Sequence, residues 1–213
     1  MKILVLDDHE SVLEGTIDVL TRHYPDAEIL TAQTAESAKN QVETSHPDLL
    51  VTDLSIPEKP GEIARSDSGV QLLRTLMKEY PTLNIVVQSA HVRSLVRLKP
   101  TIDTHEGGFT IADKSLPMKE MLAKVDWAMQ GVVYTPKEMR SGLEVKPEWL
   151  QMLKLAFEDG LQDKAIAQRM NVAERTVRHY WNKVQDALGV YPEDGKNIRI
   201  QTEIQAREEG LID

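Results

Sequence analysis

The sequence contains no cysteine, which excludes a disulfide framework and any chemistry that depends on a thiolate. No apolar run approaches the length that a helix needs to cross a bilayer, and no charged-then-apolar leader stands at the N-terminus. From these absences we expect a soluble protein of the reducing cytoplasm that makes no membrane contact.

Basic residues are scarce in the first part of the chain. Residues 1–130 contain 20 Asp and Glu against 13 Lys and Arg, a net charge of −7, whereas residues 131–213 have a net charge of −2. Within residues 163–183 the sign reverses to +3. This is a local basic patch on an acidic chain, for which the alternative is an ordinary solvated helix face.

The 213 residues are enough for two modest domains that each bury a core. In residues 1–130, short continuous apolar runs, typical of strands buried on both faces, alternate with stretches of helical periodicity. Five strands alternating with five helices predict a doubly wound parallel sheet of the α/β class. We expect strands near residues 3–6, 28–31, 48–53, 84–89 and 108–112, and helices near 11–24, 34–44, 68–80, 92–98 and 117–129.

Acidic residues stand at the ends of two of these strands. Asp53 closes the third apolar run, and Asp7 and Asp8 follow the first. The carboxyl ends of parallel strands meet at one edge, where open α/β sheets bind their ligands. Three carboxylates at this edge repel one another unless a cation lies among them, and oxygen ligands of this kind favour Mg²⁺. A single strand-end aspartate is equally a helix N-cap, but the three together favour a functional site.

A hydroxyl and an ammonium complete the predicted edge. Ser89 closes the fourth strand and Lys114 follows the fifth. Both would reach the oxygens of a phosphoryl group carried by Asp53. Taken singly, each is more often a turn or surface residue, but their occurrence at successive strand ends favours a phosphate site.

These residues together resemble the receiver domain of bacterial two-component response regulators. The resemblance covers roughly residues 1–130 and implies a flavodoxin-like fold in which a partner histidine kinase phosphorylates Asp53. It further implies that Mg²⁺ is held by Asp8 and Asp53, with Asp7 orienting it, and that Ser89 and Lys114 contact the phosphate. The resemblance rests on Leu6-Asp7-Asp8-His9, Val51-Thr52-Asp53, Gln88-Ser89-Ala90 and Lys114.

Two features depart from the family pattern. The loop at residues 58–68, between Asp53 and Gly69, is several residues longer, and its polar sequence predicts an exposed loop over the phosphorylation site. Such a loop would shield the phosphate, contact a kinase or be a neutral insertion. The aromatic switch residue of the family is expected at Ile111, and the nearest aromatic is Phe109, which shares its strand parity.

Residues 147–213 show only helical periodicity. We expect four helices, near residues 147–159, 163–170, 174–188 and 195–209, which follow a linker at residues 131–146. Within the linker, residues 133–136 are candidates for packing on the first domain. The short second helix, the tight turn and the longer third helix predict a helix-turn-helix DNA-binding domain. On local chemistry alone, a four-helix interaction module is the alternative.

The third of these helices carries most of the candidate DNA contacts. In a helix-turn-helix, the first turns of this helix enter the major groove. Arginine bonds guanine and asparagine bonds adenine, whereas threonine and lysine more often hold phosphates. The candidates are Lys164, Arg175, Thr176, Arg178, His179, Asn182 and Lys183.

The sequences at residues 160–167, 172–178 and 188–190 resemble the C-terminal DNA-binding domain of NarL/LuxR regulators. The resemblance implies that the fourth helix is a dimerisation surface and that Arg178, His179 and Asn182 face the bases. It also identifies Ala173 as a replacement for the usual hydroxyl cap, at a cost of about 1 kcal/mol of local stability. Trp181 is bulkier than usual there, and we expect it to pack inward or at the phosphate edge.

The sequence therefore predicts a transcription factor controlled by phosphorylation, not an enzyme. Phosphate on Asp53 would shift the receiver between two conformations, so that the active protein is a homodimer that reads two DNA half-sites. One alternative is a regulator independent of phosphate, whose receiver serves dimerisation or ligand or protein binding. The other is an enzyme that uses Asp53 as phosphoryl acceptor, although Ser55 stands where a second acid is needed.

Overall fold

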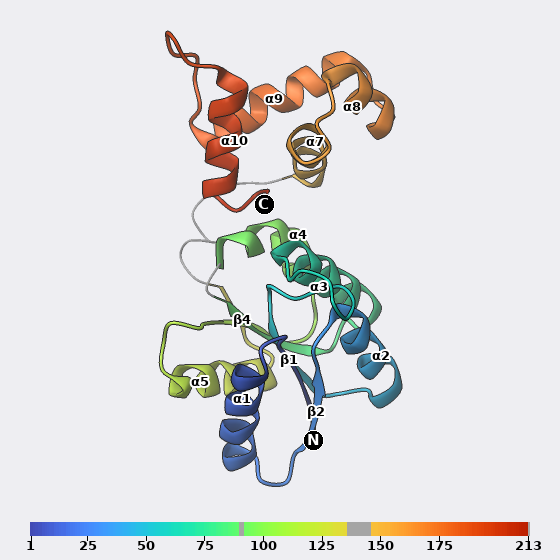
Figure 1. Ribbon diagram of the computed structural model, residues 1–213, viewed down its shortest axis with the longest axis vertical. Coiled ribbons are helices and arrows are strands. Elements are labelled where there is room, and N and C mark those ends of the chain that lie inside the picture. Colours follow the sequence, from blue (N-terminus) through green and yellow to red (C-terminus); the bar gives the residue numbers. More distant parts are fainter. Residues whose placement is uncertain (90–91, 136–145, 213) are drawn as a thin grey trace. The chain divides into compact units, whose positions relative to one another are not determined.

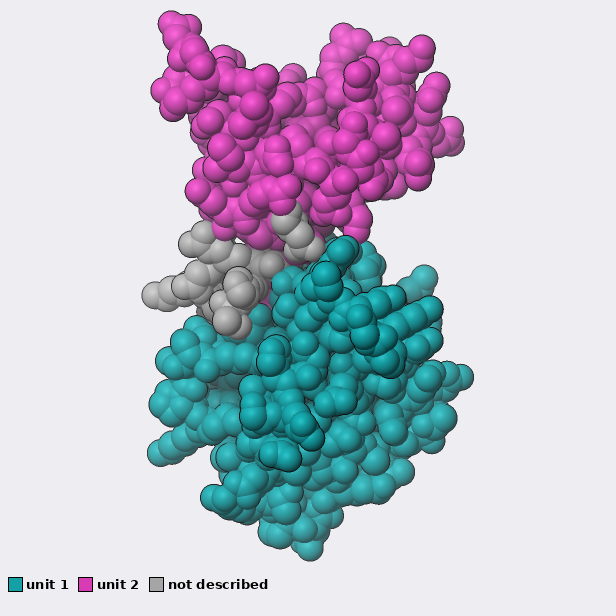
Figure 2. All heavy atoms as spheres, in the orientation of Figure 1, with its two compact units in different colours: residues 1–92, 98–136 teal, residues 93–97, 137–213 magenta. Residues whose placement is uncertain are grey.

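The computed structural model describes residues 1–89, 92–135 and 146–212. The chain divides into two compact units, residues 1–92 with 98–136 and residues 93–97 with 137–213 (Figure 2). Most of the predicted linker, residues 136–145, lies outside the described residues. None of the described helices is long and apolar enough to cross a membrane.

A parallel sheet forms the centre of the first unit, with the strand order β2-β1-β3-β4-β5-β6 (Figure 1). The strands β1, β3, β4 and β5 are buried over most of their length, which explains their continuous apolar sequences. The predicted parallel α/β sheet is confirmed. The strands are β1 (Lys2–Leu6), β2 (Glu28–Ala32), β3 (Leu49–Asp53), β4 (Asn84–Ser89), β5 (Phe109–Asp113) and β6 (Val133–Tyr134).

Helices cover both faces of this sheet, with α1 and α5 on one face and α2, α3 and α4 on the other (Figure 1). The helix expected at residues 92–98 is a 3₁₀ helix, η1 (Val92–Leu98), continued by one α-helical turn, α4 (Lys99–Ile102), in which Pro100 stands at the start. Proline suits this position because its missing N–H is not needed there. The longer helices are α1 (Glu10–His23), α2 (Ala35–Ser45), α3 (Ser66–Glu79) and α5 (Met118–Met129).

The expectation of five strands is wrong, because β6 adds a sixth strand in the segment expected to be linker. It pairs in parallel with β5, so that Val133 lies opposite Phe109. The ammonium of Lys124 on α5 lies between two rings, 3.9 Å from the centroid of Trp127 and 3.6 Å from that of Tyr134. Two residues are too few to show an alternating pattern, so the sequence alone did not reveal this strand.

A carboxylate on α5 ties the C-terminal end of α1 to that helix. The hydroxyl of Tyr24, which follows α1, donates a hydrogen bond to Asp126, and His23 Nε2 lies 3.2 Å from the same carboxylate. Burial, and then the hydrogen bond and charge of Asp126, raise the pKa of Tyr24 above its ordinary value. The neutral hydroxyl therefore stabilises the packing of α1 on α5.

We expect Tyr24→Phe to lower the free energy of unfolding by about 1 kcal/mol, because one partly exposed hydrogen bond to a carboxylate is lost. Since the folded pKa is raised, this contribution is fully present below the ordinary pKa of 10.0 and is lost as the pH rises above it. Urea unfolding of both proteins at neutral pH and above pH 10 measures this. A difference between the proteins that does not shrink at alkaline pH would contradict the assignment.

The described part of the second unit is helical. It contains α7 (Pro147–Phe157), α8 (Asp163–Met170), α9 (Glu174–Leu188) and α10 (Ile198–Glu208). Ile166, Val177 and Trp181 are buried where α7, α8 and α9 meet. In the turn between α8 and α9, Asn171 has a φ of 55°, a left-handed conformation that asparagine tolerates. The angle between α8 and α9 thus follows from one residue and a small apolar core.

Candidate functional site

The polar residues predicted to gather at one edge of the sheet do lie at the carboxyl ends of adjacent strands. Asp53 is the last residue of β3 and Ser89 the last of β4, while Asp7 follows β1 and Lys114 follows β5. The register of β1, β3, β4 and β5 brings these ends side by side. Asp7, Asp53 and Ser89 are all buried. The site therefore combines two buried carboxylates, a hydroxyl and an ammonium.

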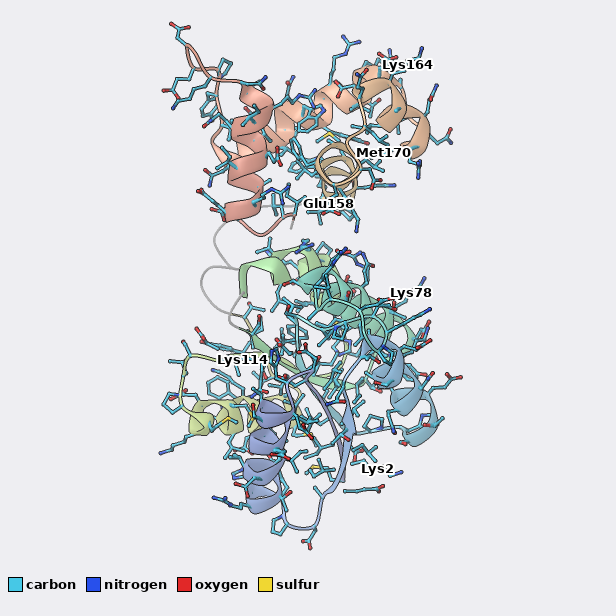
Figure 3. The ribbon with its side chains drawn as sticks, viewed as in Figure 1. Lys2, Lys78, Lys114, Glu158, Lys164 and Met170 are labelled. Atoms are coloured by element: carbon cyan, nitrogen blue, oxygen red, sulfur yellow. The ribbon has the colours of Figure 1, made fainter. Side chains whose placement is uncertain are left out.

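Lys114, which is labelled in Figure 3, forms ion pairs with both buried carboxylates. Its Nζ lies 2.7 Å from Asp7 Oδ2 and 2.8 Å from Asp53 Oδ2. Burial by itself lowers the pKa of Lys114, but the hydrogen bonds and charges of Asp53 and Asp7 outweigh it and raise the pKa above its ordinary value. The ammonium is thus held charged at the point where charge on Asp53 would change.

Backbone groups fix the other oxygens of these carboxylates. The N–H of His9 donates to Asp7 Oδ1 over 2.9 Å, and the N–H of Leu54 donates to Asp53 Oδ1 over 2.6 Å. The backbone N–H of Lys114 also donates to the carbonyl oxygen of Ser89 over 3.4 Å, which holds the lysine beside β4. Each side chain is therefore oriented by the strand ends themselves.

The residues that follow β1 fit a divalent cation. Asp8 Oδ1 is buried and has no hydrogen-bond partner, although His9 Nδ1 lies 2.9 Å away in a direction that makes no hydrogen bond. Potential ligand atoms of Asp7, Asp8 and His9 all lie within 4.8 Å of one another. A buried acceptor without a donor is costly unless a cation or water binds it.

This cluster differs from the expected ligand set of Asp7, Asp8 and Asp53. It contains His9, whereas the oxygens of Asp53 face Lys114 and Leu54. The sequence analysis gave His9 no role, although its position directly after the acidic pair was a signal.

The long loop at residues 58–68 begins by binding the start of α2. The carbonyl oxygens of Pro57 and Glu58 accept hydrogen bonds from Ala35 N and Glu36 N over 3.0 and 3.1 Å. An antiparallel bridge between Ile56 and Arg65 closes its base. The residues between are largely exposed, as expected.

A groove of about 860 Å³ lies between this loop and α1. Its walls are α1, the turn after β2 and the start of the loop. Asp8 opens onto it, so the loop borders the cation site from one side. The lining residues from the loop are Pro57, Pro60 and Gly61.

The aromatic nearest to the expected switch position belongs to the core. Phe109 is completely buried and Ile111 is 2% exposed. A ring so enclosed has no room to rotate between a buried and an exposed position. Phe109 in this structure is a packing residue of β5.

In the second unit, the candidate DNA contacts form the outer face of α9. The spacing of three or four residues places them on one side of the helix, opposite the buried Val177 and Trp181. Thr176 is half-buried, and Lys164 lies exposed on α8 (Figure 3). The candidates that are exposed on α9 are Arg175, Arg178, His179, Asn182 and Lys183.

Two details of α9 agree with the sequence analysis. Its N-cap residue, Ala173, makes no side-chain cap hydrogen bond. Trp181 is 2% exposed and packs edge-on against Phe157, with ring centroids 5.5 Å apart. Trp181 is therefore a core residue of this unit and does not reach its surface.

Comparison with known proteins gives a consistent result. Residues 3–126 match the family model described as the response regulator receiver domain. The chain is 23% identical over 203 residues to the DNA-binding transcriptional activator DevR/DosR of Mycobacterium tuberculosis, covering 89% of each chain. It is 26% identical over 200 residues to the DNA-binding transcriptional activator EvgA of Escherichia coli K12, covering 88% of this chain and 91% of that protein.

The fold also has a counterpart among solved structures. RcsB of Salmonella enterica serovar Typhimurium, bound to the promoter rprA in the presence of the phosphomimetic BeF3-, aligns with a TM-score of 0.60 at 19% identity. The alignment covers 97% of this chain and 98% of RcsB. At this identity the likeness concerns the fold alone.

Proposed function

The chain belongs to the response regulator receiver family, and on that premise we propose that it is a transcription regulator controlled by phosphorylation of Asp53. The receiver in this proposal includes β6 and therefore extends beyond the expected boundary at residue 130 to Tyr134, the linker runs from there to residue 146, and residues 147–213 are the DNA-binding domain. The observation that carries the proposal is the bridge that Lys114 forms between Asp7 and Asp53 at the carboxyl edge of the sheet.

Asp53 is the phosphoryl acceptor in this proposal. A sensor histidine kinase supplies the phosphoryl group, and Asp7 and Asp8, joined by Asp53, hold Mg²⁺. The cation offsets the charge of the phosphoryl oxygens. The buried Oδ1 of Asp8, which accepts no hydrogen bond, supports the role of Asp8 as a ligand of the cation.

Lys114 and Ser89 read the modification. The ammonium of Lys114 pairs with the carboxylate of Asp53 before phosphorylation. Once Asp53 is phosphorylated, the ammonium pairs with one phosphoryl oxygen, and the hydroxyl of Ser89 donates a hydrogen bond to another. These contacts exist in only one conformation of the receiver, so phosphorylation shifts its population. Two observations support this reading: Ser89 is buried at the end of β4, and Lys114 Nζ lies 2.8 Å from Asp53 Oδ2.

The second unit binds DNA as a helix-turn-helix. Arg178, His179 and Asn182 contact base edges from the exposed face of α9, with Arg175 and Thr176 near its start and Lys164 and Lys183 on phosphates. Two such units in a homodimer read two half-sites. The names of the relatives DevR/DosR and EvgA, both DNA-binding transcriptional activators, support this assignment.

Selection from random duplexes tests the DNA-binding half of the proposal. We expect the wild type, treated with acetyl phosphate and Mg²⁺ at fixed salt, to select a motif with two-fold symmetry. Arg178→Ala should weaken binding by about tenfold or more, because an arginine that pairs with a guanine contributes about 1–3 kcal/mol. Lys196→Ala, which removes an exposed positive charge outside α9 and α10, is the control. Absence of any selected motif would refute DNA binding by this unit.

A further inference from the structure

In the second unit, side chains from α9 and α10 both contact the carboxylate of one residue on α8. Asp163, the first residue of α8, accepts a hydrogen bond from Trp181 Nε1 of α9 over 3.1 Å. A guanidinium nitrogen of Arg199, near the start of α10, lies 2.9 Å and 3.1 Å from the two oxygens of Asp163. The guanidinium also stacks on the face of Trp181, 3.5 Å from the ring centroid. We refer to Asp163, Trp181 and Arg199 as the three-helix clamp.

The three-helix clamp is partly buried. The side chains of Asp163 and Arg199 are 32% and 38% exposed, and Trp181 is buried. Burial lowers the pKa of Arg199 against the opposing effect of Asp163. One guanidinium nitrogen contacts both oxygens of Asp163 while the planar group stacks on the indole of Trp181; lysine keeps the charge but has no planar group to stack.

The clamp connects two surfaces of the unit. One is the exposed face of α9, and the other is α10, where Ile200 and Ile204 are 54% and 47% exposed. These two side chains lie one helical turn apart on α10. A second contact between α9 and α10 is the hydrogen bond from Gln185 Nε2 to Thr202 Oγ1, at 3.3 Å. The segment between the two helices is mostly exposed, so side chains set the direction of α10.

We propose that Arg199 is a positioning residue for DNA recognition: through Asp163 and Trp181 it sets the orientation of α10 relative to α9. If α10 carries the dimer contact, as the proposed function assumes, this orientation determines the distance between two recognition helices. The clamp then decides which half-site spacing a dimer accepts. The inference rests on the proposed function and adds a determinant of spacing to it.

The experiment measures binding of the full chain, phosphorylated with acetyl phosphate and Mg²⁺, to one half-site and to paired half-sites at successive spacings. Arg199→Gln is expected to bind the single half-site within about twofold of the wild type. At the preferred spacing it should lose about tenfold, and the other spacings should become nearly equal to it. Lys196→Gln is the matched control, because Lys196 is an exposed basic residue just before α10 and pairs with Glu193 as Arg199 pairs with Asp163.

Further variants separate positioning from a structural role. Arg199→Lys keeps the charge without the planar group, so it should also flatten the spacing preference. Combining Asp163→Asn with Arg199→Gln should cost no more than the larger single effect, since both act through one contact. Equal losses on single and paired sites with an unchanged spacing preference would overturn the proposal, as would no loss at all.

The wild type distinguishes this inference from the proposed function. Binding to single half-sites without any spacing preference would refute the clamp proposal and leave DNA binding intact. Failure of the wild type to bind any DNA would refute both. Circular dichroism of each variant reports whether the second unit is folded. If Arg199→Gln is unfolded, the spacing preference is measured on Arg199→Lys instead.

Discussion

Asp53→Asn takes up no phosphate from acetyl phosphate and Mg²⁺, whereas the wild type gains a single phosphoryl group; this is the largest effect that we expect. The carboxylate of Asp53 is the nucleophile, and an amide in the same place cannot form the acyl phosphate. Asp7 is also buried and pairs with the same Lys114, but it follows β1, whereas Asp53 is the last residue of β3. Intact-mass measurement of both proteins reports the uptake.

Asp113→Asn is the matched control for this prediction. Asp113 ends β5 at the same edge of the sheet, but it is exposed and its carboxylate accepts hydrogen bonds from Ser115. The hydrogen bonds from Ser115, side chain first, lower the pKa of Asp113, so it is a carboxylate at neutral pH. We expect this variant to be phosphorylated like the wild type. Labelling of Asp53→Asn at the wild-type level would show that the acceptor lies elsewhere.

Removal of Mg²⁺ provides a second test of the same site. Chelation should stop the reaction of the wild type, because Asp7 and Asp8 would then repel the incoming phosphate. Asp8→Asn should have a similar effect, because it removes the negative charge of a carboxylate whose buried Oδ1 accepts no hydrogen bond. Unchanged phosphorylation without a divalent cation would contradict the cation site.

The strand ends were predictable because they depend on the sequence of each strand itself. Parallel strands buried on both faces need continuous apolar residues, so the run at 48–53 marks both the strand and its carboxyl end. Asp53 and Ser89 are the last residues of β3 and β4 and could be placed on one edge without coordinates. The side-chain contacts of Lys114 could not be predicted, because they depend on the register between strands that are far apart in sequence.

Elements without a repeating pattern were missed. β6 has two residues and is held by its pairing with β5 and by the rings around Lys124, none of which is a property of the segment itself. The weak helix expected at residues 92–98 is η1, and α4 (Lys99–Ile102), which has Pro100 in its first turn, was not expected. Arg199 was not singled out because its partners lie on two other helices, 18 and 36 positions away.

Gly69→Ala should strongly destabilise the receiver. Gly69 lies in the first turns of α3, and a Cβ there would stand 2.0 Å from the carbonyl oxygen of Leu54. A backbone atom cannot move aside as a side chain can, so α3 or the chain after Asp53 must shift. We expect a loss of about 3 kcal/mol in the free energy of unfolding, measured in urea by circular dichroism.

The same change at another glycine should have the opposite sign. Gly15 lies within α1, and nothing stands within 4 Å of the position of its Cβ. Because alanine has the higher helix propensity, Gly15→Ala should raise the free energy of unfolding by up to about 1 kcal/mol. A stabilising effect at both positions would show that the approach of α3 to Leu54 is not a constraint on the fold.

A third glycine separates the effect on stability from the effect on phosphorylation. A Cβ at Gly108 would stand 1.9 Å from the carbonyl oxygen of Ala128, at the opposite end of β5 from Lys114. Gly108→Ala should therefore destabilise the receiver about as much as Gly69→Ala. Only Gly69→Ala displaces Leu54, whose N–H binds Asp53 Oδ1, so under folding conditions it alone should slow phosphate uptake from acetyl phosphate. Equal rates in the two variants would mean that the backbone after Asp53 does not orient the acceptor.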